Sequence, residues 1–205
     1  MFLKVCGITR LADGLHAVEH GATALGFVFW PRSPRYVSPE AAADIIARLP
    51  RSVMTVGLFV NESAEHIRAV VRQTGIGTVQ LHGDEPPQLA EELGQPVLRA
   101  IDVSGAEQAC AEWPAETTFL VDAVDPVRRG GTGVKVDWER AATLAREWRV
   151  VLAGGLNPEN VAEAIVAVRP YGVDVSSGVE EAPGVKDPDK VARFLANARN
   201  AFEAR

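Results

Sequence analysis

The stretch Phe2–Cys6 (FLKVC), followed at once by Gly7–Arg10 (GITR), decides the fold predicted for this chain. Side chains alternate between the two faces of a strand, so the Lys4 ammonium and the Cys6 thiol share one face. Gly7 lets the chain turn without steric cost where the strand ends. The apolar residues that follow recur with helical spacing, which indicates a strand–turn–helix unit.

This strand–turn–helix unit occurs eight times along the 205 residues. Patterns of buried strands occupy residues 2–6, 23–29, 53–60, 78–81, 96–101, 118–121, 150–153 and 171–175. Helical spacing or helix-capping residues follow each strand, at 9–21, from 38, 62–73, 86–93, 104–113, 137–148, from 157 and 188–202. The succession predicts an α/β fold, a compact (β/α)8 TIM barrel with a degenerate fifth helix, in which residues 1–205 form one domain. An open doubly wound sheet is disfavoured because no Gly-x-Gly-x-x-Gly pattern follows the first strand.

Composition narrows the range of partners. Hydrophobic residues make up 47% and charged residues 23% of the chain, which is ordinary for a soluble globular protein. A net charge of −6 argues against a broad nucleic-acid or membrane-surface footprint, but it leaves room for a local cationic pocket. We find no signal peptide, no membrane-spanning run and no disulfide framework, so we expect a cytoplasmic protein, monomeric or homodimeric, that binds a small phosphorylated molecule.

Polar residues follow the predicted strands at their carboxyl ends. They are Cys6, Asn61, His82, Asp122, Gly154-Gly155 and Ser176-Ser177-Gly178. In a barrel these positions meet at one rim, which is where such enzymes bind their ligands. A free cysteine is most often a small buried hydrophobe, but this clustering favours a catalytic function for Cys6.

The last two of these groups have the chemistry of a phosphate site. Gly154 and Gly155 expose backbone N–H groups ahead of a helix, whose N-terminal end favours anions. Ser176, Ser177 and Gly178 supply further donors from the neighbouring strand. Neither loop contains Lys or Arg, so we expect backbone amides to bind the phosphate. The alternative is that the glycines only serve tight turns.

Asp122 emerges from an apolar strand, where partial desolvation favours a protonated carboxyl able to act as a general acid. The alternative is an aspartate that accepts backbone hydrogen bonds in the following turn, a task for which Asp125 is better placed. Lys4 should lie inside the barrel, where an unpaired ammonium is costly. We therefore expect an ion pair between Lys4 and Asp174. The positive charge of Lys4 would also help to lower the pKa of Cys6.

Two further side chains could contact a ligand. Arg35 lies in a Pro-rich loop beside aromatic residues and could bind a carboxylate through two hydrogen bonds, or it could be a solvated loop charge. His82 could face the ligand or pack in the core, and the sequence does not decide between them. The histidines at 16, 20, 66 and 82 form no evident ligand set, so no metal is expected.

Taken together, the motifs resemble one family along the whole chain. They are Lys4–Thr9 (KVCGIT), Gly26–Phe29 (GFVF), Ser33–Tyr36 (SPRY), Gln80–Gly83 (QLHG), Leu120–Asp122 (LVD), Gly130–Gly133 (GGTG), Ala153–Leu156 (AGGL) and Asp174–Gly178 (DVSSG). The chain resembles the phosphoribosylanthranilate isomerases of tryptophan biosynthesis, and the KVCGIT opening is highly specific.

The resemblance implies an intramolecular aldose–ketose isomerase without a cofactor. Its reaction would be the Amadori rearrangement of N-(5-phosphoribosyl)anthranilate to 1-(2-carboxyphenylamino)-1-deoxyribulose 5-phosphate. By the same resemblance Cys6 is the general base and Asp122 the general acid. Arg35 would face the anthranilate carboxylate, and the two Gly/Ser loops would bind the phosphate.

Two other interpretations stay open. The histidine-pathway phosphoribosyl isomerase is a sister barrel with the same chemistry, but it has an aspartate at the end of the first strand, so Cys6 argues against it. A barrel that binds a phosphorylated ligand without turnover is the alternative from another class. Conversion of the substrate by the purified protein distinguishes the two classes.

Overall fold

A computed structural model describes residues 1–104, 106–122 and 136–205. Eight parallel strands form a closed barrel in which each strand pairs with its neighbours in sequence and β8 pairs with β1. The strands are β1 Phe2–Cys6, β2 Ala24–Val28, β3 Met54–Phe59, β4 Thr78–Leu81, β5 Val97–Ile101, β6 Thr118–Val121, β7 Val150–Leu152 and β8 Gly172–Val175. The predicted TIM barrel is confirmed.

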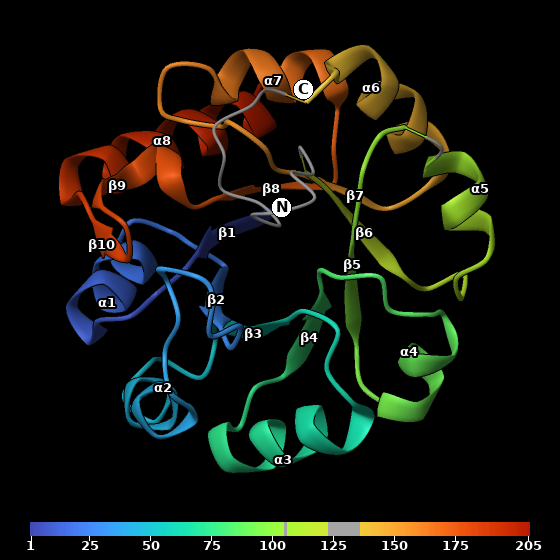
Figure 1. The fold of residues 1–205 in the computed structure, drawn as a ribbon. Coiled ribbons are helices and arrows are strands. Elements are labelled where there is room, and N and C mark those ends of the chain that lie inside the picture. Colours follow the sequence, from blue (N-terminus) through green and yellow to red (C-terminus); the bar gives the residue numbers. More distant parts are fainter. Residues whose placement is uncertain (105, 123–135) are drawn as a thin grey trace.

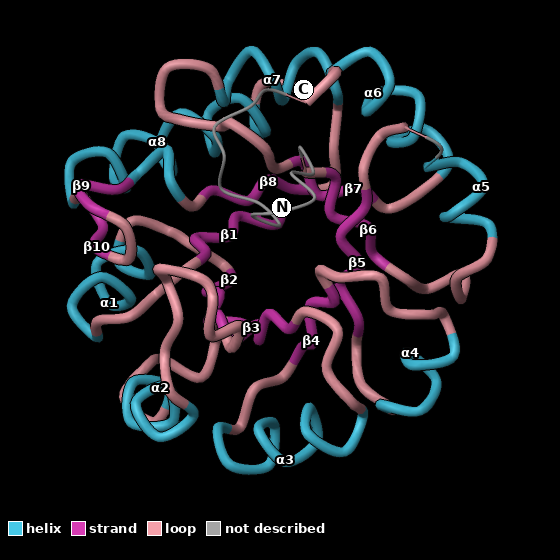
Figure 2. The backbone as a smooth tube through the Cα atoms, viewed as in Figure 1, coloured by secondary structure: helices cyan, strands magenta, loops and turns pink. Residues whose placement is uncertain are grey.

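In the described residues eight α-helices surround the ring of strands, and they follow one another around the barrel in sequence order (Figures 1 and 2). They are α1 Leu11–Glu19, α2 Pro39–Ile46, α3 Ala64–Thr74, α4 Gln88–Leu93, α5 Ala106–Ala111, α6 Trp138–Glu147, α7 Val161–Val168 and α8 Pro188–Glu203. Helix α5 is short, as expected, and α4 has the same length of six residues. None of the helices in the described part of the chain has the length and apolarity needed to cross a membrane.

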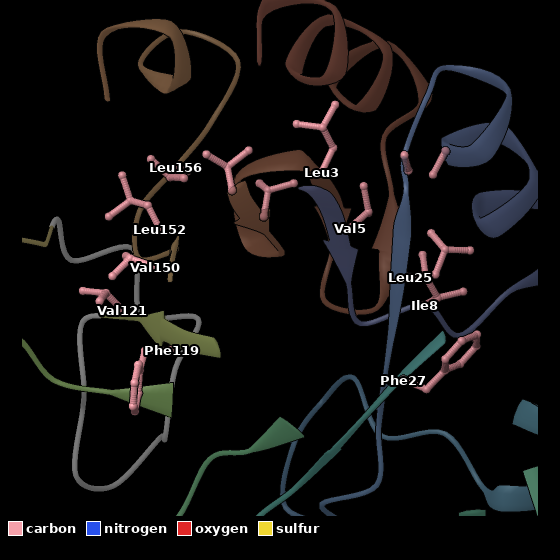
Figure 3. Packing of buried hydrophobic residues seen from close by; sticks show 14 of the residues in the cluster. Leu3, Val5, Ile8, Leu25, Phe27, Phe119, Val121, Val150, Leu152 and Leu156 are labelled. Carbon is pink, nitrogen blue, oxygen red and sulfur yellow. The ribbon is translucent and has the colours of Figure 1, made fainter. Parts of the chain in front are cut away.

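Strand alternation separates two apolar layers. Leu3 and Val5 point outward from β1 and pack with the corresponding side chains of other strands beneath the helices (Figure 3). Phe2 belongs instead to a small cluster inside the barrel, and Cys6 to another cluster that also contains Val28. The outer layer holds the helices on the barrel, while the inner clusters pack inside it, one of them around Cys6.

Side-chain capping fixes where several helices begin. Ser38, Ser63, Asp137 and Asp187 each accept a hydrogen bond from a backbone N–H in the first turn of α2, α3, α6 and α8. Such caps satisfy donors that have no partner within the helix. They place each helix directly after the loop that leaves the rim of the barrel.

Two segments differ from the sequence-based expectation. Helix α7 begins at Val161 because the Asn157 side chain accepts the N–H groups of Glu159 and Asn160 in a turn, which precedes the helix. Between β8 and α8 the chain forms a 3-10 turn, Ser177–Val179, and an antiparallel pair, β9 Glu180–Ala182 with β10 Val185–Lys186. The motif at Gly130–Gly133 and the turn containing Asp125 lie outside the described residues.

Candidate active site

Cys6 and Lys4 lie inside the barrel, where Lys4 forms an ion pair. The Lys4 side chain is fully buried, and its Nζ lies 2.9 Å from Oδ2 of Asp174 on the neighbouring strand β8. Gly26 on β2 makes room for them, since a Cβ there would lie 2.6 Å from Cys6 Sγ and 3.1 Å from Lys4 Cε. The predicted Lys4–Asp174 pair is confirmed.

Two opposing effects set the pKa of Cys6, and Lys4 acts in the expected direction. Burial raises the pKa of the Cys6 thiol, and the nearby Lys4 ammonium lowers it by less, so the net pKa is raised. Burial also opposes the charge on Lys4, but attraction to Asp174 and Cys6 outweighs it and the pKa of Lys4 is raised. Lys4 therefore stays cationic and limits, without reversing, the cost of forming a thiolate.

Asp122 and His82 meet across the rim. Asp122 follows β6, His82 follows β4, and both are buried. His82 Nε2 lies 3.7 Å from Asp122 Oδ2, while the Gln80 amide nitrogen lies 2.9 Å from His82 Nδ1. Because an amide nitrogen only donates, Nδ1 accepts this bond and the proton of a neutral ring lies on Nε2, toward Asp122. The side chain of His82 thus has a defined orientation toward the carboxylate, which the sequence left undecided.

The β9–β10 hairpin brings two charged groups to Arg35. Glu180 accepts hydrogen bonds of 2.8 Å from Arg35 Nε and 2.7 Å from Nη2, and a third of 2.9 Å from Lys186 Nζ. Burial opposes the charge on Glu180, yet these cations hold its pKa below the ordinary value. Burial also lowers the pKa of Lys186 although Glu180 opposes this shift.

This pairing fixes the orientation of the Arg35 guanidinium. Glu180 occupies the edge formed by Nε and Nη2, so the edge formed by Nη1 and the second Nη2 proton faces elsewhere. The Arg35 side chain also lies against Gly7, where a Cβ would come within 2.8 Å of Arg35 Cδ. One planar fork of N–H groups thereby remains for another carboxylate.

The two Gly/Ser loops lie in direct contact. Gly178 packs against the carbonyl of Leu156, and a side chain there would collide with it. Gly154 and Gly155 have φ values of 72° and 67°, a left-handed conformation that favours glycine. Asn160 holds this loop, since its Nδ2 donates to Gly155 O at 2.9 Å. All five predicted phosphate-site residues, Gly154, Gly155, Ser176, Ser177 and Gly178, keep partial exposure.

Comparison with known proteins decides the family. Residues 3–197 match the family model described as N-(5'phosphoribosyl)anthranilate (PRA) isomerase. The chain belongs to the phosphoribosylanthranilate isomerase family. It is therefore an isomerase of tryptophan biosynthesis, as its motifs predicted.

Relatives and solved structures agree over the whole length. The N-(5'-phosphoribosyl)anthranilate isomerase of Trichlorobacter lovleyi is 52% identical over 204 residues, 98% of each chain. A phosphoribosyl anthranilate isomerase crystallised with reduced 1-(o-carboxyphenylamino)-1-deoxyribulose 5-phosphate is 43% identical, with a TM-score of 0.87 over 98% of this chain and 99% of that one. Monomers generated from the dimeric Thermotoga maritima enzyme are 42% identical, with a TM-score of 0.86 and the same coverage.

Three residues of the site, Glu180, Lys186 and Asn160, are not predicted from the sequence patterns. Glu180 and Lys186 lie between the last predicted strand and the last predicted helix, where the sequence patterns predict no element. The Pro183-Gly184 dipeptide between them is a turn signal that could have revealed the hairpin. Asn160 is not predicted because the sequence places the beginning of α7 at residue 157, whereas the helix begins at Val161.

Cavity size does not locate the site of this isomerase. A cavity of about 630 Å³ lies at the opposite end of the barrel, among the first residues of strands, such as Phe2, Thr78 and Val97. A smaller one of about 220 Å³ lies beside His82, at the carboxyl ends of β4 and β5. The titratable groups gather at the second end, which is where TIM barrels place their chemistry.

Proposed function

We propose that this protein catalyses the Amadori rearrangement of N-(5'-phosphoribosyl)anthranilate to 1-(2-carboxyphenylamino)-1-deoxyribulose 5-phosphate, with Asp122 as general acid and Cys6 as general base. The observation that carries the proposal is the presence of a buried thiol beside Lys4 and a buried carboxyl beside His82 at one rim. Family membership supplies the substrate.

The first step opens the ribose ring. The Asp122 carboxyl donates its proton to the ring oxygen as the bond between that oxygen and C1 breaks. The anilino nitrogen lone pair forms a C1=N bond, so the product is an iminium ion and Asp122 is left as a carboxylate. His82 presents Nε2–H to this carboxylate and so fixes the direction of the acid.

In the second step the Cys6 thiolate takes the proton from C2. The electrons of that C–H bond form C1=C2, and the electrons of C1=N return to nitrogen, which gives an enolamine. Tautomerisation of the enolamine, by proton transfer from the C2 hydroxyl to C1, yields the ketone. The cationic imine acidifies the C2–H bond, and Lys4 helps to offset the cost of a buried thiolate.

Binding at both ends of the substrate would place the sugar between acid and base. The edge of Arg35 turned away from Glu180 fits the anthranilate carboxylate. Backbone amides around Gly155 and Ser177 fit the phosphate, in keeping with their partial exposure and the contact between the loops. Two fixed ends make the proton transfers effectively intramolecular.

The remaining expectations belong to the same proposal. The reaction as written needs no cofactor and no metal. We propose that residues 1–205 act as a single domain, as a monomer or a homodimer in the cytoplasm. The Thermotoga maritima relative is dimeric, which supports the second arrangement without assigning it to this chain.

The test is turnover of the purified protein, followed by the fluorescence of the anthranilate adduct. Wild type should consume the substrate. In Cys6→Ala and in Asp122→Asn the rate of turnover should be lower by a factor of roughly 10²–10⁴. Cys110→Ala is the matched control, because Cys110 is also buried but lies on α5. Binding without turnover by wild type would favour the phosphate-binding barrel and refute the proposal.

A further inference from the structure

Helix α1 carries a cluster of potential metal ligands outside the site described above. His16, Glu19 and His20 each offer one ligand atom, and these atoms lie within 4.8 Å of one another. The three residues form a His-x-x-Glu-His sequence, whose spacing of three and four residues places them on one helical face. This grouping differs from the expectation that the four histidines form no ligand set.

The hydrogen bonds of the two histidines leave one ring nitrogen of each available to an ion. His16 Nε2 lies 3.0 Å from the Pro188 carbonyl oxygen, and His20 Nδ1 lies 2.9 Å from the His16 carbonyl oxygen. A carbonyl oxygen only accepts, so these nitrogens carry the ring protons and the lone pairs lie on His16 Nδ1 and His20 Nε2. Histidines that bind metals have this arrangement, with the second ring nitrogen donating to a carbonyl or a carboxylate.

We propose that His16, Glu19 and His20 form a binding site for a divalent transition ion, with Zn²⁺ as the ion that fits best. Two imidazole nitrogens and one carboxylate oxygen are a donor set that Zn²⁺ accepts, with a water as the fourth ligand. Zinc–ligand bonds of about 2.0–2.1 Å in a tetrahedron require ligand atoms about 3.4 Å apart. The three ligand atoms now lie within 4.8 Å of one another, so the partly exposed side chains would close to that spacing on binding the ion.

The site would connect α1 and α8, the helices that follow the two strands, β1 and β8, whose pairing closes the barrel. Pro188 is the first residue of α8, so the ring that binds the ion is also bonded to the beginning of that helix. Fixing the His16 ring on an ion therefore fixes the α1–α8 contact. Binding to the folded state alone raises stability by mass action, so Zn²⁺ should raise the melting temperature.

The test is calorimetric titration of the metal-free protein with Zn²⁺. We expect one equivalent to bind to wild type. Changing a residue that merely orients a ligand costs about 10–100-fold in affinity, so His16→Ala and His20→Ala should cost at least about 100-fold. Glu19→Gln should weaken binding by less, and His66→Ala, on the exposed face of α3, should change nothing.

A second readout separates this site from zinc bound by thiols. Zn²⁺ should raise the melting temperature of wild type and of Cys6→Ala and Cys110→Ala, but not of His16→Ala or His20→Ala. The melting temperature without Zn²⁺ shows whether each variant is folded. No binding by wild type, or unchanged binding after either histidine is replaced, would overturn the proposal. Unchanged affinity in Glu19→Gln would overturn the assignment of the third ligand.

Discussion

Replacing Lys4 with methionine should destabilise the barrel strongly, because it leaves the Asp174 carboxylate buried without its counter-ion. Lys4 is fully buried and the two side chains meet at 2.9 Å. Removing one partner of a buried pair typically costs about 3–5 kcal/mol, against a total stability of roughly 5–15 kcal/mol for a typical domain. Replacing both partners with apolar residues is often close to neutral. The double variant Lys4→Met, Asp174→Val should therefore be more stable than either single variant.

Urea unfolding of the four proteins measures this as a double-mutant cycle. Two single losses of about 3–5 kcal/mol and a nearly neutral double variant give a coupling energy of about 6–10 kcal/mol. Arg193→Met is the matched control, because the Arg193–Glu159 pair is even shorter, at 2.6 Å, but its side chains are 60% and 63% exposed. It should cost less than about 1 kcal/mol. Additive losses at Lys4 and Asp174 would refute the reasoning.

The Lys4→Met variant also tests the effect of the ammonium on the Cys6 thiol. Lys4 lowers the pKa of Cys6 against the larger effect of burial. Lys4→Met should therefore raise the pKa of Cys6 further, and alkylation of this thiol at a fixed pH should slow. The comparison is best made in a background without the other cysteine, Cys110→Ala. An unchanged alkylation rate would show that the ammonium does not act on Cys6.

Three further predictions concern turnover. Because burial raises the pKa of Cys6, kcat/KM should still rise with pH above 9.0, the ordinary pKa of a thiol. Cys6→Asp should move this rising part of the pH profile to lower pH. A plateau of kcat/KM at neutral pH in wild type would contradict the prediction. Cys6→Ala and Asp122→Asn should lower kcat by roughly 10²–10⁴ while substrate binding, measured by fluorescence titration, stays close to wild type. Glu180→Gln should weaken the hold on Arg35 and raise KM by about tenfold, the equivalent of about 1.4 kcal/mol, whereas Glu181→Gln, its exposed neighbour, should leave steady-state kinetics unchanged.

The barrel could be predicted because its signals are local. Each strand is a short apolar run and several helices begin at a capping residue such as Ser38 or Asp137, so the sequence carries the alternation directly. The Lys4–Asp174 pair was also predictable, since strand alternation points both side chains inward and barrel closure makes β1 and β8 neighbours. Both inferences need only periodicity and topology.

What escaped prediction depends on opposing effects or on short irregular segments. The pKa of Cys6 is the balance between burial and the charge of Lys4, and the sequence gives the sign of each effect but not which is larger. The β9–β10 hairpin has only five strand residues, too few for a period to appear. Glu180 and Lys186 therefore look like ordinary surface charges until the hairpin folds them against Arg35.

A common principle connects the charged groups of the rim. Lys4 is held by Asp174 and Arg35 by Glu180, each at less than 3 Å, while Asp122 faces His82 from another strand. Every one of these contacts joins segments far apart in the chain, so the closed barrel itself sets the orientation of each group before a substrate arrives. Groups fixed in advance need no reorganisation when charge develops on the substrate, which is where preorganised sites lower a barrier most. The hairpin residue Glu180, whose side chain is only 5% exposed, is then as much a part of the site as the strand ends, because without it Arg35 would have to be ordered by the substrate at the expense of binding energy.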